Sequence, residues 1–486
     1  MPFEEMEFSP FDKAEHKAYR AFELYEEGKI SQALLELEDA LDIDPASSSL
    51  HFNKALSLDT ISRFDDAIAE YEIALQLNPE DLEILNSLAV DYTRAGHYDL
   101  AIDTFERIES LDPAFEPSYC NRIITYTEMG QHDLAEQMFY LAQQIEPDCA
   151  LCFYNIGNSL FVRSQHTKAV RCWLKTIELE PDHPQINYRI AQAYWLAGDT
   201  IRAHEHFLAE IRKNPGDVDV IFDFGLFLLE VGDVESAKEK FNRILELDPG
   251  FAPALFYLAE IVFNKGHYER AAELLNKALQ KDNTLIGPRY RLAQYALMKG
   301  QTRKARNYLV SEMELGPQNA DALVSMGSMF LQIFEQGHEG LFAGFIMQEK
   351  SGWAFNDMQN AGLCPELDYA THCLLKAVDI NSSNADAYYY LALADAIKGQ
   401  LQNAAKFFAH SLDIRPDDIC TLRDSAALYV AMGKLDDAAQ RIEKAEALAP
   451  DDVRLKEVSR RIRLARKAEK LEDFLVRFRP RPTHTK

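Results

Sequence analysis

The stretch FYNIGNSLFVRSQHTKAVRCWLKTIELEP, residues 153–181, contains the features that decide the fold. It runs from an apolar segment with a small residue, Gly157, through Ala169, and it ends at Pro181. Proline recurs on both sides of it at constant intervals of 34, at Pro45, Pro79, Pro113, Pro147, Pro181, Pro215 and Pro249. Asn283 takes the next position and Pro317 resumes the series, so the chain is built from a repeating 34-residue unit.

The spacing of these breaks changes once. The interval from Pro317 to Ser382 is 65, and Pro416 and Pro450 then follow at the usual intervals of 34. One unit therefore holds an insertion of thirty-one residues. Twelve units lie between about Lys13 and Pro450.

An alanine fixes the register inside each unit. The residue twelve positions before each break is alanine in all twelve units: Ala33, Ala67, Ala101, Ala135, Ala169, Ala203, Ala237, Ala271, Ala305, Ala370, Ala404 and Ala438. A second small residue follows most breaks by ten positions, and most units have a glycine seventeen positions before the break. Small residues at fixed points allow two helices to approach closely, and glycine suits the left-handed turn between them. Each unit is predicted to be a helix, a turn and a second helix.

The repeat pattern resembles that of the tetratricopeptide repeat (TPR) family. Residues 153–181 follow the family pattern, and so does LFYLAE (255–260) with its alanine at Ala271. The resemblance implies an all-α, superhelical alpha-solenoid of helix-turn-helix repeats, because one hairpin cannot bury its apolar face without neighbours. It also implies a non-enzymatic scaffold or adaptor, and no catalytic residue is carried over from the family. We expect an N-terminal extension at 1–12, the twelve-repeat array at 13–450, and a basic capping helix and tail at 451–486.

Composition narrows the class of partner. The chain has 486 residues and a formal net charge of −27, which disfavours nucleic acid and anionic lipid surfaces and favours basic partners. The N-terminus lacks the features of a signal peptide, and no apolar run reaches the roughly 18 residues of a membrane-spanning helix. We therefore expect a cytoplasmic protein that binds basic or extended protein or peptide segments, without nucleic acid and without membrane insertion.

Two segments depart from the repeat pattern. The insertion, at about 335–366 inside the tenth repeat, carries the aromatic residues Phe342, Phe345, Trp353 and Phe355. It is either a lid on the array or a contact for a partner. After Pro450 an apolar stripe recurs at helical spacing, formed by Val458, Ile462, Ala465, Leu471, Leu475 and Phe478. This helix is expected to cap the array, and its basic excess offers a second possibility, contact with an acidic surface.

The cysteines raise the question of a metal. Cys149 and Cys152 form a Cys-x-x-Cys pair at a predicted helix start, and Cys120 and Cys172 lie in the same or adjoining unit. Four thiolates can bind zinc, but a second Cys-x-x-Cys pair is missing and Cys172 occupies an ordinary packing position. The sequence therefore predicts buried free thiols, no metal and no cofactor.

A column of aromatic residues marks the candidate binding groove. In TPR proteins the first helix of each hairpin lines the concave surface, and the residue seven after each break should project inward. This column and its neighbours give the predicted groove residues: Tyr154, Asn155, Asn158, Tyr188, Arg189, Gln192, Phe222, Phe256, Tyr257, Tyr290, Arg291 and Gln294. The pattern Tyr188-Arg-Ile-Ala-Gln192 recurs as Tyr290-Arg-Leu-Ala-Gln294, three repeats later. Ordinary packing between first helices is the alternative explanation.

Three function hypotheses follow. The first is a scaffold that binds a peptide or protein segment in the concave groove. The second is a regulatory or substrate-recruiting subunit of an enzyme complex, docking through the 335–366 insertion. The third, a metal-dependent enzyme built around the four mid-chain cysteines, has the least support. The sequence does not identify the partner.

Overall fold

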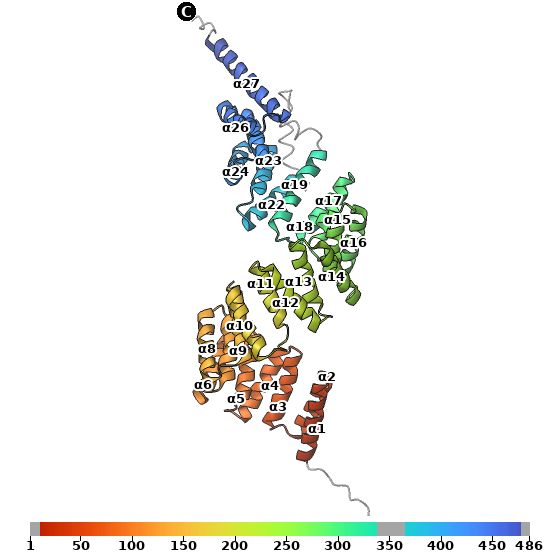
Figure 1. Ribbon diagram of the computed structural model, residues 1–486, viewed down its shortest axis with the longest axis vertical. Coiled ribbons are helices and arrows are strands. Elements are labelled where there is room, and N and C mark those ends of the chain that lie inside the picture. Colours follow the sequence, from red (N-terminus) through yellow and green to blue (C-terminus); the bar gives the residue numbers. More distant parts are fainter. Residues whose placement is uncertain (1–9, 338–364, 478–486) are drawn as a thin grey trace, which may run out of the picture. The chain divides into compact units, whose positions relative to one another are not determined.

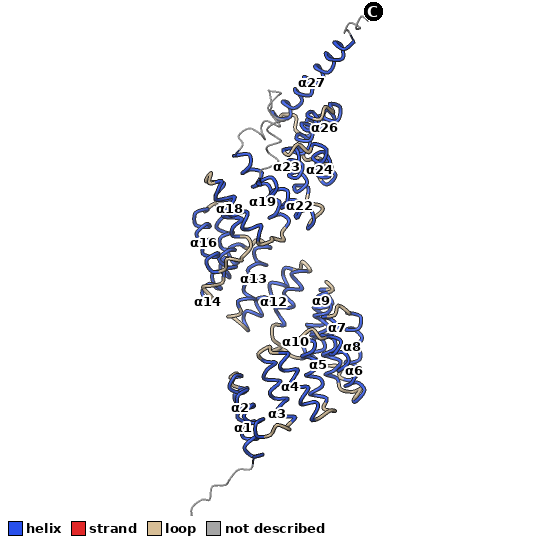
Figure 2. Tube along the Cα trace, turned by 180° about the vertical axis from the view of Figure 1, so that it is seen from behind, coloured by secondary structure: helices blue, strands red, loops and turns tan. Residues whose placement is uncertain are grey.

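The computed structural model of the protein describes residues 10–337 and 365–477. Every regular element in these ranges is a helix, and no strand occurs in them (Figures 1 and 2). The chain divides into two compact units, residues 1–233 and 234–486, called here the first and second unit. The predicted all-α solenoid of helical hairpins is confirmed. The 34-residue period runs unbroken through the boundary, so no change in the repeat pattern marks this division.

The helices of the first unit form consecutive antiparallel hairpins. They are α1 (Pro10–Glu26), α2 (Ile30–Ile43), α3 (Ser48–Thr60), α4 (Phe64–Leu77), α5 (Leu82–Arg94), α6 (Tyr98–Leu111), α7 (Glu116–Glu128), α8 (His132–Ile145), α9 (Ala150–Val162), α10 (His166–Leu179), α11 (Ile186–Leu196), α12 (Thr200–Lys213) and α13 (Val218–Glu230). Within this unit each odd-numbered helix is the first helix of a repeat, and the even-numbered helix after it is the second.

The second unit continues in the same way. Its helices are α14 (Val234–Leu247), α15 (Ala252–Asn264), α16 (Tyr268–Lys281), α17 (Pro288–Met298), α18 (Thr302–Glu314), α19 (Ala320–Gly337), α22 (Pro365–Ile380), α23 (Ala385–Ile397), α24 (Leu401–Ile414), α25 (Ile419–Ala431), α26 (Leu435–Leu448) and α27 (Val453–Arg477). The tenth repeat pairs α19 with α22, on either side of the predicted insertion. Most of that insertion, with Phe342, Phe345, Trp353 and Phe355, lies outside the described residues.

The small residues sit where the helices of a hairpin meet. All twelve register alanines are completely buried. Gly157 plays the same part on α9, because a Cβ atom there would lie 2.6 Å from Cδ1 of Trp173 on α10. Close packing between the two helices of a hairpin therefore explains why these positions hold small residues.

The turn inside each hairpin uses a left-handed residue. At Gly96 the backbone has φ of 80°, and the amide of His97 bonds back to the carbonyl of Tyr92 at 2.8 Å, which closes the end of α5. Two repeats have serine at the same point, Ser62 with φ of 59° and Ser164 with φ of 58°. The turn geometry is thus a property of the repeat, and glycine is the residue that fits it best.

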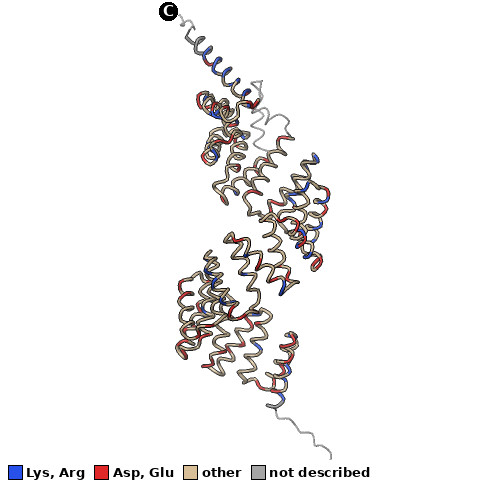
Figure 3. The backbone as a smooth tube through the Cα atoms, viewed as in Figure 1, with Lys and Arg blue, Asp and Glu red and all other residues tan. Residues whose placement is uncertain are grey.

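The last hairpin is covered by α27, as predicted. Leu455, Val458 and Ile462 are buried in one cluster with Leu422 on α25 and Ile442 on α26. Lys and Arg residues recur along α27, whereas acidic residues are spread over the hairpins (Figure 3). Among the described residues, no helix combines the length and the apolar character that a bilayer crossing requires.

Candidate functional site

The first helices form a continuous layer within parts of each unit. In the first unit α5 packs on α7 and α7 on α9, and in the second unit α17 packs on α19 and α19 on α23. From α2 to α12 and from α16 to α26, each second helix packs on the first helix of its own repeat and on the first helix that follows. Successive first helices therefore touch one another in these parts of the two units. We call the layer that they form the first-helix face, and the predicted groove residues belong to first helices of both units.

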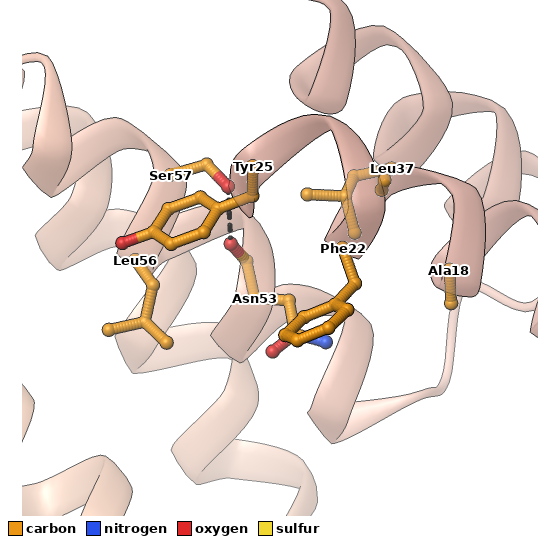
Figure 4. A pocket seen from close by; sticks show the side chains of 8 residues that line it. Ala18, Phe22, Tyr25, Leu37, Asn53, Leu56 and Ser57 are labelled. Atoms are coloured by element: carbon orange, nitrogen blue, oxygen red, sulfur yellow. Dashed lines mark hydrogen bonds between the residues drawn. The ribbon is translucent and has the colours of Figure 1, made fainter. Parts of the chain in front are cut away.

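A hollow opens on this face at the N-terminal end of the first unit (Figure 4). Its volume is about 140 Å³, and its lining consists of Ala18, Ala21, Phe22, Tyr25, Leu37, Asn53, Leu56 and Ser57. These side chains come from α1, α2 and α3. The walls are mainly apolar, and the Asn53 amide adds a donor and an acceptor at an exposed position.

Two polar groups that line this hollow, the hydroxyls of Ser57 and Tyr25, have hydrogen-bond partners within the protein. Ser57 donates its hydroxyl proton to the carbonyl of Asn53 at 2.9 Å, a bond within α3. The Tyr25 hydroxyl lies 3.0 Å from Oγ1 of Thr60. Phe22 is 59% exposed, and Tyr19, one turn earlier on α1, is 65% exposed. Two aromatic rings of α1 are thus exposed to solvent, and one of them, Phe22, lines the apolar hollow, an arrangement typical of a binding surface.

The sequence analysis missed this end of the face. The column of residues seven positions after each break starts at Phe52, because Pro45 is the first break of the series. Counting one period backwards would have placed Ala18 in the column and Phe22 one turn further along the helix. The signal was present, but the first repeat lacks the preceding break that sets the register.

The three predicted groove residues of α9 differ in how deeply they are buried. Tyr154 is half-buried, and its ring centroid lies 4.5 Å from that of His183. Asn155 is buried, and its amide donates to the carbonyl of Cys120 at 3.2 Å. Asn158 is half-buried on the same helix. Asn155 is therefore an interior residue, unlike the surface residue that the sequence analysis expected.

The first Tyr-Arg-Gln set is tied to the next repeat. The Tyr188 hydroxyl donates to Oδ2 of Asp223 at 2.7 Å, and the Gln192 amide donates to the same oxygen at 3.0 Å. Burial, followed by the bond to Asp223, raises the pKa of Tyr188. The Nε of Arg189 is buried without a hydrogen-bond partner among the described residues. Phe222, also predicted, is half-buried on α13 beside Asp223.

The second set is tied to the preceding repeat. The Arg291 guanidinium donates two hydrogen bonds of 2.6 Å to the carboxylate of Glu260 on α15 and a third of 2.9 Å to Gln294. Its centre also lies 5.1 Å from the ring centroid of Tyr290. Burial disfavours the charged guanidinium, but the hydrogen bonds to Glu260 outweigh it and raise the pKa of Arg291.

The aromatic pair of α15 completes the predicted residues. The rings of Phe256 and Tyr257 have centroids 5.2 Å apart, and the Tyr257 ring stacks on Phe241 at 5.5 Å. Phe256 covers the backbone of Gly287, where a Cβ atom would lie 2.6 Å from the ring.

The two Tyr-Arg-Gln sets belong to different units, and each is brought together locally with a different acidic partner.

Three of the four cysteines considered for zinc meet, and the fourth does not. The Sγ atoms of Cys120, Cys149 and Cys152 cluster with the carboxylate of Glu116. Cys172 is partly buried on α10, outside this group. Burial raises its pKa to about 11, as for an ordinary packing thiol.

Comparisons with known proteins agree with the fold. Residues 52–114 and 154–218 match a tetratricopeptide repeat family, residues 396–462 match a second family of that description, and residues 188–288 match the cilia and flagella-associated protein 70 middle TPR-like domain. With its helical hairpins in a 34-residue register, the chain is a tetratricopeptide repeat protein. No curated protein matches its sequence.

Solved structures of TPR proteins are also similar to it. YrrB, described as a TPR protein with an unusual peptide-binding site, is 17% identical, and the match covers 46% of this chain and 99% of YrrB with a TM-score of 0.37. The Cut9–Hcn1 hetero-tetramer of the APC/C gives 15% identity, coverage of 93% and 90%, and a TM-score of 0.40. Yeast Tom70 is 13% identical, and the match covers 96% of this chain and 97% of Tom70 with a TM-score of 0.36.

Proposed function

We propose that the protein is a non-enzymatic scaffold that binds an extended segment of a partner protein along its first-helix face. The fold is that of a protein–protein interaction scaffold. The observation that carries the proposal is the hollow between α1 and α3, with the exposed rings of Phe22 and Tyr19 beside it. In the proposal this hollow anchors one apolar side chain of the bound segment, and Asn53 pairs with its backbone.

The chemistry of the partner follows from charge. Acidic residues outnumber basic ones in the two hairpins that build the hollow, residues 10–77, and in the chain as a whole. Three cations are adjacent in the sequence to residues that line the hollow, and each is paired with an acid: Lys17 with Asp39 at 2.7 Å, Arg20 with Glu23 at 3.0 Å and Lys54 with Glu70 at 2.8 Å. A segment with an apolar anchor and flanking Lys or Arg residues is therefore the proposed ligand, because these charges accelerate association.

In this proposal the predicted groove residues on α9, α11 and α13 contact the bound segment beyond its anchor. Tyr154, Asn158 and Phe222 are half-buried on α9 and α13, where they would contact the extended segment beyond the anchor. Tyr188 and Gln192 are already bonded to Asp223, so they would contribute ring surface more than free hydrogen-bonding groups. The anchor is therefore expected to supply most of the binding free energy.

The test is a selection of peptides from a random library against the full-length protein, followed by affinity measurements on single-residue variants. Phe22→Ala should weaken the binding of the selected peptides by about tenfold or more, because it removes the exposed aromatic ring that lines the hollow and that the bound segment would cover. Leu35→Ala is the matched control, because Leu35 is 63% exposed on α2 of the same hairpin but does not line the hollow. Equal affinities for the two variants, with both folded, would reject the proposed anchor.

A further inference from the structure

Three thiols and a carboxylate converge in the first unit. Sγ of Cys120, Cys149 and Cys152 and one carboxylate oxygen of Glu116 all lie within 4.8 Å of one another. The Cys152 thiol donates to Oε1 of Glu116 at 2.9 Å. A tetrahedral ion with metal–sulfur bonds of about 2.3 Å holds its ligands roughly 3.8 Å apart. The cluster is therefore only slightly wider than the ligand set of one metal ion.

Helix geometry brings these four groups together. Glu116 and Cys120 are four residues apart on α7, so they share one face of that helix. Cys149 and Cys152 form a Cys-x-x-Cys pair at the start of α9, a spacing that is common in zinc sites. Because α7 packs directly on α9, two ligands come from each of two neighbouring first helices.

The position of Cys149 differs from that in the other repeats. It is the N-cap of α9, and its sulfur accepts the amide of Cys152 at 3.2 Å. In five other repeats the same position is occupied by a residue that caps its helix with a side-chain oxygen, namely Ser47, Asp81, Asp217, Asn384 and Asp418, and Phe115 and Phe251 take it without a side-chain cap. Oxygen caps are the usual choice, so capping alone does not account for a cysteine here.

Packing alone does not account for the other members either. The position of Cys152 is occupied by the buried aliphatic residues Leu50, Ile84, Ile186 and Val220 in four other repeats of this unit, and by the buried Ser118 in the repeat before it. Glu116 occupies a position where Leu82, Ala150 and Val218 stand in other repeats. A glutamate and three thiols thus replace ordinary repeat residues at one place in the stack.

The electrostatics of the group suit a cation. The Cys149 sulfur lies at the N-terminus of α9, where the helix dipole favours a thiolate. Three thiolates and one carboxylate carry the same formal charge as the four thiolates of a Cys₄ zinc site.

An outer partner is present as well. Asn155 is buried, and besides its bond to the Cys120 carbonyl its amide lies 3.5 Å from the Cys120 sulfur. Donors of this kind orient and tune the thiolates of a metal site. This gives Asn155 a role that its place in the predicted groove did not suggest.

We propose that Glu116, Cys120, Cys149 and Cys152 bind one Zn²⁺ ion that links the first helices α7 and α9. Thiolate ligands favour zinc over calcium or magnesium, and four protein ligands are typical of a structural site. The proposal departs from the sequence-based prediction of no metal, which looked to Cys172 for the fourth ligand and did not consider Glu116. It does not depend on the peptide-binding proposal.

The test uses full-length, tag-free protein, reduced and loaded with Zn²⁺ and then dialysed. The expected result is one Zn²⁺ per chain, a melting temperature that rises with Zn²⁺ concentration, and, with Co²⁺ in its place, the visible spectrum of a tetrahedral thiolate site. Cys149→Ser should reduce the affinity by more than the roughly 10–100-fold that loss of an outer hydrogen-bond partner costs. Cys172→Ala is the matched control, because Cys172 lies nearby in the chain but outside the cluster, and it should retain the metal.

Other outcomes overturn the proposal. Reduced wild-type protein that holds no Zn²⁺ after dialysis, or Cys149→Ser protein that binds as tightly as the wild type, would show that the cluster is not the site. Glu116→Gln, which preserves the shape of the side chain, keeps the test decisive if the serine variant does not fold. An unchanged Zn²⁺ affinity in Glu116→Gln would remove the carboxylate from the proposed ligand set.

Discussion

The hydroxyl of Tyr188 on α11 donates a 2.7 Å hydrogen bond to the carboxylate of Asp223, which stands one repeat later on α13. The same relationship recurs in the second unit, where Tyr389 donates to Asp424 at 2.8 Å. Both pairs are 35 residues apart, one repeat plus one residue. A tyrosine in the groove column can therefore fasten its helix to the next first helix.

The first prediction follows from this bond. Tyr188→Phe should lower the free energy of unfolding of the first unit by about 1.5–3 kcal/mol, because the lost bond has a charged acceptor; the bond from Gln192 to Asp223 remains. Circular dichroism melting would measure the loss. Tyr194→Phe, on the same helix, is the control. A Tyr188→Phe protein that is as stable as the wild type would mean that the bond adds nothing to helix packing.

Much of the fold could be predicted because its determinants repeat locally. The alanine register, the breaks and the turn glycines lie within one 34-residue period, so twelve copies of the same local signal reinforce one another. The division near Asp233 has no such marker, since Pro215 and Pro249 keep the usual spacing across it. A boundary set by contacts between whole hairpins leaves no trace in the period.

The candidate sites were harder to predict because their partners lie a repeat away. Tyr188 and Tyr290 begin the same sequence pattern, yet the first set bonds forward to Asp223 and the second bonds back to Glu260. The pattern itself contains neither acid. In the same way Glu116 lies only four residues before Cys120, but its meeting with Cys149 depends on how α7 packs on α9.

The second prediction concerns Gly157, where helix propensity and packing act in opposite directions. Alanine is normally favoured over glycine inside a helix by about 0.5–1 kcal/mol. Here its Cβ atom would lie 2.6 Å from Cδ1 of Trp173, whose ring is completely buried and whose Nε1 donates to the Tyr154 carbonyl at 3.2 Å. Gly157→Ala should therefore destabilise the first unit by about 1–3 kcal/mol. A partial rescue by Trp173→Leu would confirm that the ring is the obstacle.

The third prediction concerns the two serines in left-handed turns. Ser62 and Ser164 have φ of 59° and 58°, where a side chain is strained and glycine is not. Ser164→Gly should stabilise the protein by about 0.5–1 kcal/mol, after allowance for the greater freedom of glycine in the unfolded chain. Gly96→Ser is the reciprocal change at an equivalent turn and should destabilise it by a similar amount. Chemical denaturation would reveal both, and a loss of stability in Ser164→Gly would contradict the strain argument.

The fourth prediction is a pH dependence centred on Asp91. This carboxyl is 1% exposed on α5, faces Asp59, Arg94 and Tyr71, and has a pKa raised to about 7 by burial and then by Asp59. The unfolded pKa is about 3.9, so folding takes up a proton between about pH 4 and pH 7, and this group's contribution to stability falls as pH rises through that window. Asp91→Asn should remove this loss of stability between about pH 4 and pH 7, because the amide does not ionise.

The comparison must be made at two pH values. At pH 8 Asp91→Asn should be more stable than the wild type by up to about 4 kcal/mol, and the difference should shrink toward pH 4. Asp59→Asn is the control, since it removes the like charge but leaves Asp91 buried, and it should give a smaller gain. Parallel stability curves for Asp91→Asn and the wild type would show that Asp91 is not the group responsible.

The fifth prediction concerns the ion pair of Arg291 and Glu260 in the second unit. The side chains are 21% and 18% exposed and are joined by two hydrogen bonds of 2.6 Å, so loss of either partner leaves a largely buried charge. Arg291→Gln and Glu260→Gln should each destabilise the second unit by about 1–3 kcal/mol, less than the cost for a fully buried pair. The double variant should lose less than the sum of the two, because neither charge is then left alone. A double-mutant cycle from denaturation curves measures this coupling. Additive losses would mean that the two residues act separately, and Arg291 would then be free to serve a partner.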